Sequence, residues 1–195
     1  MLSSVVHLDP SLQKAFRNID GFGLLSQKTK LPLKNRYLTP ATLGNDRLAN
    51  AVAGAFLFPK KNVLIVDIGT CIKFDFINSK NEYMGGSISP GMEMRFKSLH
   101  HFTGKLPYIQ ASKKTTLTGK STEDAIRSGV MNGMKEEISG IIHRYKKNYK
   151  TLTIILTGGD AHRFAGELKM SIFAAADLVN IGLNEILRYN KTGRA

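Results

Sequence analysis

The sequence has few of the features that mark secreted and membrane proteins. It contains a single cysteine, Cys71, so no disulfide can form within the chain, which agrees with a reducing compartment. No stretch approaches the ~18 apolar residues of a membrane span. The N-terminus, MLSSVVHLDP, also lacks the basic start and long apolar stretch of a signal peptide. We therefore expect a soluble, cytoplasmic protein with no membrane partner.

Acidic residues are scarce relative to basic ones. The chain has 15 Asp and Glu against 28 Lys and Arg, which gives a formal charge of +13. Such a surface attracts phosphates without regard to sequence. The basic residues occur in small groups, such as 60–61 and 143–150, and form no dense stripe or recognisable base-reading module. We therefore interpret them as solvated faces that also favour anionic substrates such as nucleoside triphosphates, and do not expect nucleic acid as the partner.

No internal repeat, low-complexity tract or flexible linker interrupts the chain. With 195 residues, 42% of them hydrophobic, it can bury a core in one domain or in two small halves. Continuous apolar runs at 63–66 and 153–156 predict buried strands, and helical patterns precede and follow them. This order of strands and helices predicts an α/β architecture.

Apolar spacing, prolines and glycines place the other elements. We expect a half-buried strand over 72–78 with polar residues at alternate positions, and a glycine-rich loop over 84–93 (MGGSISPGME). The capping box at 121–124 (STED) starts a long amphipathic helix. A further strand is expected at 2–6, and further helices from Asp9, from Gly44, and over 92–102, 161–168 and 174–187.

The long helix carries an apolar stripe together with three glycines. The stripe consists of Ile126, Val130, Met134, Ile138, Ile141 and Tyr145. Gly129, Gly133 and Gly140 each disfavour an isolated helix by roughly 1 kcal/mol. Their spacing indicates that another helix packs closely there. That helix belongs either to a second copy, which predicts a homodimer, or to this chain.

Two strand ends carry residues suited to a cation and a phosphate. The segment 63–70, VLIVDIGT, ends with Asp67, which could hold a metal or monovalent cation, and with Thr70, whose hydroxyl suits a phosphate oxygen. Gly69 allows a tight turn and a close approach of backbone to ligand. A turn hydrogen bond from Asp67 is the plain alternative. The strand at 153–156 ends in Gly158-Gly159 before a helix, an arrangement that favours anions.

Seven motifs, taken in order, resemble the type III pantothenate kinases. They are GNDRLAN (44–50), VDIGTCIKFDFI (66–77), GGSISPGMEMR (85–95), KLP (105–107), GKSTEDAIRSG (119–129), LTGGDA (156–161) and LVNIGLNEIL (178–187). Several independent motifs in the right order are far more specific than any single one. The resemblance implies the actin-like and sugar-kinase ATPase superfamily, built from two ribonuclease H-like halves. Residues 1–58 would be the remnant of the first half and residues 59–195 the second half with the nucleotide and cation site.

The resemblance implies transfer of the γ-phosphoryl group of magnesium-bound ATP to the hydroxyl of pantothenate, the first step towards coenzyme A. Asp46 matches the general base of the family, and a carboxylate at a helix start can accept the hydroxyl proton. As a residue type it could equally cap the helix. Arg47 would steady the substrate or the developing charge. Gly44 and Asn45 would line the same substrate site.

The family match also gives roles to the strand ends. Asp67 matches the residue used for a potassium or ammonium ion, and Thr70 the residue that contacts ATP. Gly69, Gly158 and Gly159 would shape the nucleotide site.

Thr122 matches a pantothenate contact near the dimer interface, although its hydroxyl could simply cap the helix. We expect Asp46 to face a common cleft with Asp67 and Thr70, because the base must reach a substrate beside the triphosphate.

Family members normally open with a strand that ends in a D-x-G-N-T phosphate loop, whereas this sequence begins with LSSVV at residues 2–6. We therefore expect the first half to be incomplete and this polypeptide alone to form little phosphopantothenate, because groups that position magnesium and phosphate would be missing. The alternatives are a non-catalytic dimeric scaffold and a basic, nucleic-acid-associated regulatory protein, which would bind DNA with a steep salt dependence.

Overall fold

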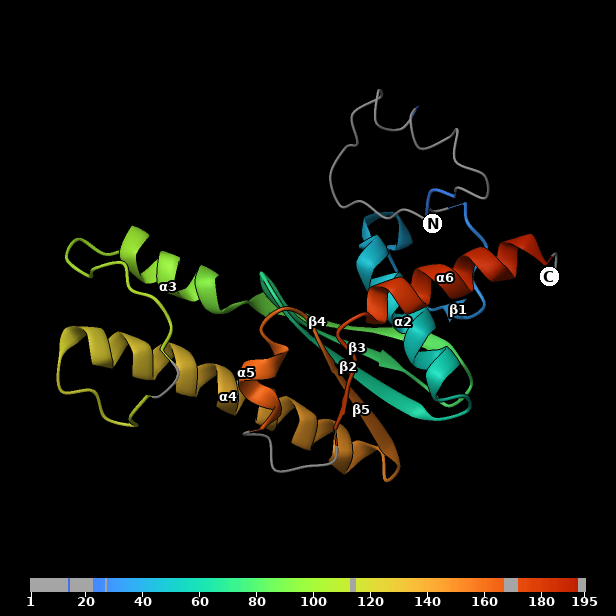
Figure 1. Cartoon of the computed structure of the whole chain (residues 1–195). Coiled ribbons are helices and arrows are strands. Elements are labelled where there is room, and N and C mark those ends of the chain that lie inside the picture. The colour runs from blue at the N-terminus through green and yellow to red at the C-terminus, as the bar shows by residue number, and fades with distance from the viewer. Residues whose placement is uncertain (1–13, 15–22, 27, 113–114, 167–171, 193–195) are drawn as a thin grey trace. The chain divides into compact units, whose positions relative to one another are not determined.

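The computed structural model describes residues 14, 23–26, 28–112, 115–166 and 172–192 (Figure 1). The strand expected at 2–6 and the helix expected from Asp9 lie outside these residues. Within the described residues, six strands form one sheet in the order β1-β4-β3-β2-β5-β6, and helices are interspersed with them along the chain. The predicted α/β architecture is therefore confirmed.

The described elements follow one another along the chain in a fixed order. They are β1 (Lys34–Asn35), the 3-10 helix η1 (Pro40–Thr42), α2 (Asn45–Leu57), β2 (Asn62–Ile68), β3 (Cys71–Ile77), β4 (Glu82–Pro90), α3 (Met92–His101), α4 (Thr122–Asn148), β5 (Leu152–Thr157), α5 (Ala161–Ala165), β6 (Phe173–Ala174) and α6 (Leu178–Lys191). Strand β1 pairs parallel with β4, and β5 pairs parallel with β6. Strands β2, β3 and β4 are consecutive neighbours joined by tight turns, which makes them antiparallel and the sheet mixed.

The chain divides into two compact units. The first consists of residues 1–65, 75–85 and 177–195, and the second of residues 66–74 and 86–176. The predicted halves, 1–58 and 59–195, are defined by a fold that is repeated within the family. The two units are defined by which residues contact one another, so they do not test these halves. The halves stay a prediction.

In the first unit, α2 is buried along most of its length. Its residues from Arg47 to Gly54 are all buried. On one side, a Cβ added at Gly54 would lie 3.0 Å from the Ile65 side chain of β2. On the other, α6 packs directly against α2 (Figure 1), and a Cβ added at Gly182 would lie 1.8 Å from the carbonyl oxygen of Ala49. Small residues in both helices therefore allow this close contact.

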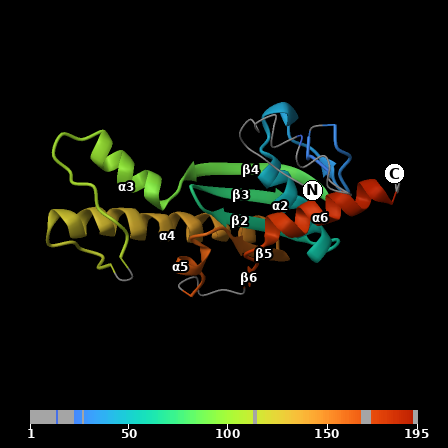
Figure 2. The ribbon, with the colours of Figure 1, turned by 45° about the horizontal axis from the view of Figure 1, so that its top comes forward.

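In the second unit, α4 is the longest element, with 27 residues, and α3 lies beside it (Figure 2). The predicted capping box is confirmed, because the Ser121 hydroxyl accepts the backbone N–H of Asp124 at 3.1 Å. Most of the predicted apolar stripe is buried, but Ile141 and Tyr145 are only partly buried and Ile142 takes the core position. The buried face has rotated by one residue there, as expected of a 3.6-residue helix over many turns.

Two expectations about the strands were wrong. Residues 84–90, predicted as a loop, belong to β4, where pairing with neighbouring strands outweighs the local turn signal. Within β4, Gly85 has a φ of +98°, a conformation that residues with a side chain rarely adopt, so this position favours glycine. Strand β3 was predicted to be half-buried with its polar residues towards solvent, yet Asp75 is completely buried.

The last helix begins at Leu178, and not at residue 174, because residues 173–174 form β6.

In the part of the chain that the structure describes, no helix is both long enough and apolar enough to cross a membrane.

The α2–α6 contact gives a stability test. Gly182→Ala would place a methyl group against the backbone of Ala49, which cannot rotate away as a side chain could. We expect a loss of about 1–3 kcal/mol in the free energy of unfolding, although alanine favours a helix by up to ~1 kcal/mol. Urea unfolding monitored by circular dichroism measures it. Asn184→Ala, at an exposed position of the same helix, is the control and should change stability little. Equal stability of the two variants would contradict this packing.

Candidate functional site

The buried end of β2 carries a charged pair. Residues 63–68 are all buried, so the strand continues one residue beyond its predicted end at Asp67. The Asp67 carboxylate is 11% exposed and its Oδ2 lies 2.8 Å from Nζ of Lys73, which is 17% exposed. Sequence analysis did not single out Lys73, because it appeared only as one of the alternating polar residues of β3. The two strands of the hairpin thus bring opposite charges together.

The turn between β2 and β3 is held by the start of α3. The backbone N–H of Gly69 donates to the Cys71 carbonyl at 3.1 Å, and that of Gly91 donates to the Thr70 carbonyl at 3.0 Å. A Cβ at Gly91, the N-cap of α3, would lie 2.1 Å from the Gly69 carbonyl oxygen. This contact requires glycine at residue 91. The Thr70 side chain is exposed, so its hydroxyl can reach a ligand.

The second predicted glycine turn, after β5, lies directly on the end of β2. Gly158 has a φ of +94°, and a Cβ there would lie 2.3 Å from the Ile68 carbonyl oxygen and 2.6 Å from Oδ1 of Asp67. The backbone N–H of Asp160 donates to the same Ile68 carbonyl at 3.0 Å. The structure therefore brings together the two turns that sequence analysis assigned to the nucleotide.

A cavity of about 350 Å³ opens beside this turn. Its lining consists mainly of small side chains, from Leu156, Thr157, Gly158, Gly159, Ala161, His162, Ala165, Ala174, Ala175 and Ala176. The volume lies within the range of small-molecule sites. The start of α5 beside this cavity was predicted to offer free N–H groups to an anion. The N–H groups of Asp160 and Ala161 instead donate to the carbonyls of Ile68 and Gly158. The space, more than free N–H groups, makes this turn suitable for a ligand.

The GNDR motif forms the start of α2. Gly44 is the N-cap, so Asp46 lies at the second residue of the helix and does not take the capping position that was its alternative role. The Asp46 carboxylate folds back over Gly44, where a Cβ would lie 2.5 Å from Oδ1. Asn45 donates from Nδ2 to the Leu25 carbonyl at 3.3 Å. Asp46 remains partly exposed, as a proton acceptor for a ligand must be.

Arg47, in contrast, is buried and bound to a network that sequence analysis missed. Its Nε and Nη2 donate to Oδ1 of Asp75 at 2.9 and 2.6 Å, and the Tyr83 hydroxyl donates to the same oxygen at 2.6 Å. Its guanidinium also lies 5.6 Å from the centre of the Tyr37 ring. The signal for Asp75 was an acid between two phenylalanines of a strand, which predicts a buried partner and not a solvated face.

This network shifts the pKa values of its members. Burial acts to lower the pKa of Arg47, but the hydrogen bonds and the negative charge of Asp75 outweigh burial and raise it. Burial, followed by the Asp75 charge and hydrogen bond, raises the pKa of Tyr83 above its ordinary value. Arg47 therefore stays charged and Tyr83 stays protonated, and the three side chains hold the first turn of α2 in place.

Thr122 is the first residue of α4 and is exposed. The hydroxyl that caps the helix is that of Ser121, so the structure does not support capping as the role of Thr122. Further along α4, Glu137 accepts from the Ser89 hydroxyl at 2.5 Å and pairs with Arg95 of α3. These contacts tie the GGSISPGMEMR motif to α4.

Asp46 belongs to the first unit, whereas Asp67, Thr70 and Thr122 belong to the second. Their common cleft therefore stays a prediction.

The residues around Asp67 fit a separate monovalent cation poorly. Oδ2 already carries the Lys73 ammonium, and Oδ1 lies against the backbone of Gly158. A further cation close to the ammonium would meet repulsion, which for two unit charges about 4 Å apart is about 4 kcal/mol at an effective dielectric constant of about 20. Among the described residues, moreover, no group of three or more His, Cys, Asp and Glu could hold a metal ion.

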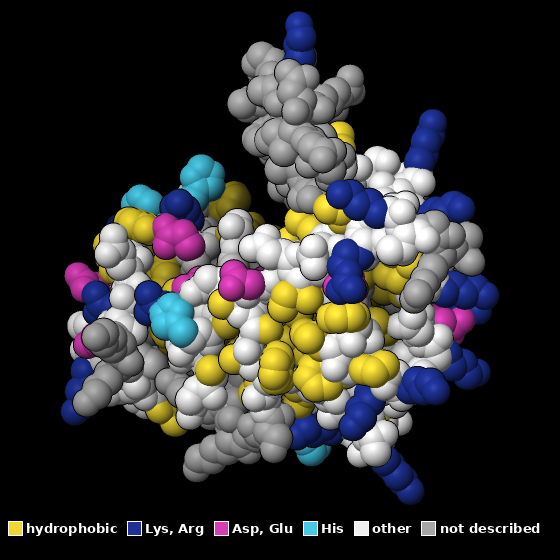
Figure 3. All heavy atoms as spheres, turned by 45° about the vertical axis from the view of Figure 1, so that its right-hand side comes forward, with side chains coloured by type: hydrophobic (Ala, Val, Ile, Leu, Met, Phe, Trp, Pro, Cys, Tyr) yellow, Lys and Arg dark blue, Asp and Glu magenta, His cyan; other side chains and the backbone are white. Residues whose placement is uncertain are grey.

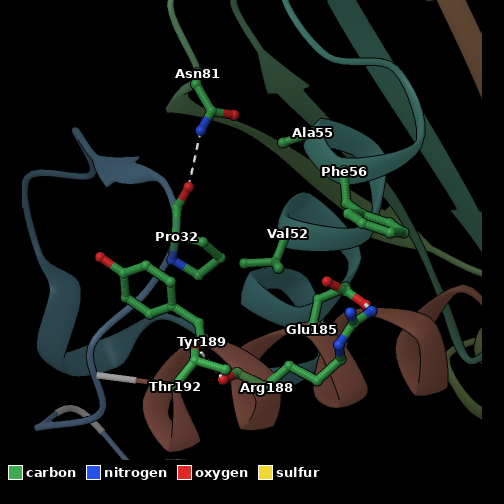
Figure 4. A pocket seen from close by; sticks show the side chains of 9 residues that line it. All are labelled: Pro32, Val52, Ala55, Phe56, Asn81, Glu185, Arg188, Tyr189 and Thr192. Carbon is green, nitrogen blue, oxygen red and sulfur yellow. Dashed lines mark hydrogen bonds and ion pairs between the residues drawn. The ribbon is translucent and has the colours of Figure 1, made fainter. Parts of the chain in front are cut away.

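A different cavity, of about 290 Å³, lies in the first unit between α2, α6 and the segment before β1 (Figure 4). None of the predicted site residues lines it. Its polar groups include Asn81, which donates to the Pro32 carbonyl at 2.8 Å, and Arg188, which pairs with Glu185 at 3.0 Å. These contacts bind the elements of the unit to one another, and we assign the cavity no chemistry.

The buried network gives a second stability test with a matched control. Arg47→Ala would leave the Asp75 carboxylate buried without its cation, and we expect a loss of about 3–5 kcal/mol in the free energy of unfolding. Arg36→Ala is the control, because Arg36 also donates from Nε and Nη2 to a single carboxylate oxygen, that of Glu82, but is 46% exposed. Its loss should be much smaller. Denaturant unfolding of both variants measures the difference, and equal losses would refute the role of burial.

Comparisons with known proteins agree with the motifs. A family model described as type III pantothenate kinase matches residues 1–144. The chain is 51% identical to the type III pantothenate kinase of Cytophaga hutchinsonii, over 90% of this chain and 75% of the relative. It is 47% identical to that of Christiangramia forsetii, over 98% of this chain and 79% of the relative.

A solved structure shares the fold. It is a Campylobacter jejuni protein described as a Baf family transcriptional activator, with a TM-score of 0.62 and 21% identity over 96% of this chain and 82% of that one. The ordered motifs, the family model and these relatives agree: the chain belongs to the type III pantothenate kinase family.

Proposed function

We propose that this chain carries the substrate and nucleotide residues for transfer of the γ-phosphoryl group of ATP to the hydroxyl of pantothenate, which forms 4'-phosphopantothenate, the first step towards coenzyme A. Membership of the family makes it a phosphotransferase with ATP and pantothenate as substrates. The observation that carries this conclusion is the identity of 47–51% to type III pantothenate kinases over 90–98% of the chain.

The nucleotide is proposed to bind where the turns after β2 and β5 meet. Thr70 has an exposed hydroxyl for a phosphate oxygen. A Cβ at Gly69 or Gly159 would meet no described atom within 4 Å, so the backbone there is accessible, and Gly158 allows the turn after β5 to lie on the end of β2. The cavity of about 350 Å³ beside Gly158 offers space for the nucleoside. Magnesium would arrive with ATP and offset the charge that develops on the phosphate oxygens. Three features of one unit thus support the same ligand.

Asp46 is proposed as the general base that accepts the pantothenate hydroxyl proton. Its partial exposure supports this role, and its place in the first turn of α2 fixes the direction of its carboxylate. Arg47 is proposed to act indirectly, as a positioning residue. Because Asp75 and Tyr83 hold its guanidinium, Arg47 would keep the first turn of α2 in place more than grip the substrate. Gly44 and Asn45 would line the substrate side of this turn.

The active form is proposed to be a homodimer, with Thr122 contributing to the pantothenate site near the interface. The three glycines of α4 support this arrangement. A Cβ at Gly129, Gly133 or Gly140 would meet no described atom of this chain within 4 Å, so the close helix contact that their spacing predicts is not made within the described part of the chain. A second copy remains the candidate partner for that face.

The nucleic-acid alternative rests on the formal charge of +13 alone. Figure 3 shows lysine and arginine side chains separated around one face, with no continuous stripe on it. Phosphate-binding proteins that follow a nucleic acid backbone present such a stripe.

The base assignment predicts a kinetic defect without a folding defect. Asp46→Asn should lower kcat by about 10²–10⁴-fold, because the amide cannot accept the proton, and should leave the melting temperature nearly unchanged. The assay is ATP-dependent phosphopantothenate formation, run on this chain and on the chain extended by the opening D-x-G-N-T segment of a relative. Glu185→Gln, which removes an acid of α6, is the matched control and should keep the parental rate. Parental kcat in Asp46→Asn would refute the base.

The dimer predicts a change in mass. Gly133→Arg places a large charged side chain on the exposed glycine face of α4, and we expect it to convert the dimer to monomer in sedimentation velocity measurements. Gly104→Arg is the control, since a Cβ at Gly104 also meets no described atom within 4 Å but lies outside any helix. A monomeric parent, or a dimer that survives Gly133→Arg, would argue against this interface.

A further inference from the structure

Lys73 occupies the position next to Asp67 at which sequence analysis expected a potassium or ammonium ion. Its Nζ lies 2.8 Å from Oδ2 of Asp67, and both side chains are largely buried. We propose that the Lys73 ammonium is the built-in monovalent cation of this site, so that the protein binds its nucleotide without potassium or ammonium. This inference deepens the proposed function, because it rests on Asp67 lying at the phosphate end of the nucleotide site.

The ammonium supplies what a monovalent ion would supply. It carries one positive charge, and the separation of 2.8 Å is typical of a charge-assisted hydrogen bond to a carboxylate. It is also tethered. Lys73 and Asp67 lie on strands joined only by the two-residue turn of Gly69 and Thr70, so the charge is held in place at a high effective concentration. An ion from solution would have to displace it.

The surroundings of Asp67 leave little opportunity for such displacement. Oδ1 faces the backbone at Gly158, where even a Cβ would lie 2.6 Å away. The pair is also shielded from solvent, so the ammonium cannot exchange Asp67 for water without leaving a buried carboxylate unneutralised. One positive charge satisfies the site, and Lys73 supplies it.

The alternative is a purely structural ion pair that only stabilises the hairpin. The two roles differ in one measurable property, since a cation site emptied of its lysine should accept a small cation, whereas a structural pair should simply be lost. Lys73→Ala opens the space and removes the charge. Lys73→Met removes the charge but fills the space with an apolar side chain of similar length, and is the matched variant.

The melting temperature is measured in chlorides of potassium, ammonium and tetramethylammonium at equal ionic strength, because the last ion is too large to enter. The wild-type chain should melt at the same temperature in all three. Lys73→Ala should melt lower in tetramethylammonium and recover roughly 3 °C or more, saturably, in potassium or ammonium. Lys73→Met should melt lower without recovery. Lys97→Ala, which removes the lysine of an exposed pair with Glu93, should show no cation preference.

A saturable potassium or ammonium effect on the wild-type melting temperature would overturn the proposal, because it would reveal a separate cation site. So would the absence of cation-specific recovery in Lys73→Ala, or equal recovery in Lys73→Met. The wild-type measurement can overturn the proposal even where a variant fails to fold. Binding of a magnesium complex of a fluorescent ATP analogue, measured in the same salts, should be cation-independent in wild type and cation-dependent in Lys73→Ala. Failure of the analogue to bind at all would count against the proposed function, and the melting series would still test Lys73.

Discussion

A carboxylate at the buried end of a strand is the constraint around which the candidate nucleotide site is arranged. A carboxylate buried there is costly without an opposite charge beside it, and Lys73 supplies that charge from the next strand. The same carboxylate and the neighbouring Ile68 carbonyl exclude any side chain at residue 158. The turn after β5 can therefore lie directly on the end of β2, which brings two glycine turns to one place.

The first unit applies the same principle to a different purpose. Its buried charge is that of Arg47, which is neutralised by Asp75 and further held by the Tyr83 hydroxyl. Because these three side chains fix the first turn of α2, the adjacent Asp46 can remain partly exposed and still keep a defined direction. The neighbour of the proposed base, more than the base itself, thus provides the rigidity that proton transfer at a fixed distance requires.

Local patterns predicted the parts of the fold that depend on one segment only. The continuous apolar run at 63–66 gave a buried strand, and the capping box gave the start of α4, because burial on both faces and helix capping both leave a signal within a few residues. Residues 84–90 show the limit. Their glycines and proline favour a loop, and only pairing with distant strands makes them part of β4.

The partners of the charged residues show the same limit more sharply. The sequence by itself determined the family, through the order of its motifs, and the candidate residues Asp46, Asp67 and Thr70. Only the tertiary structure decided that Asp67 is paired with Lys73 and that Arg47 is committed to Asp75, a residue 28 positions away. The reason is physical: the spacing of residue types records which face of an element is buried, but the partner that neutralises a buried charge is chosen by the packing of separate elements.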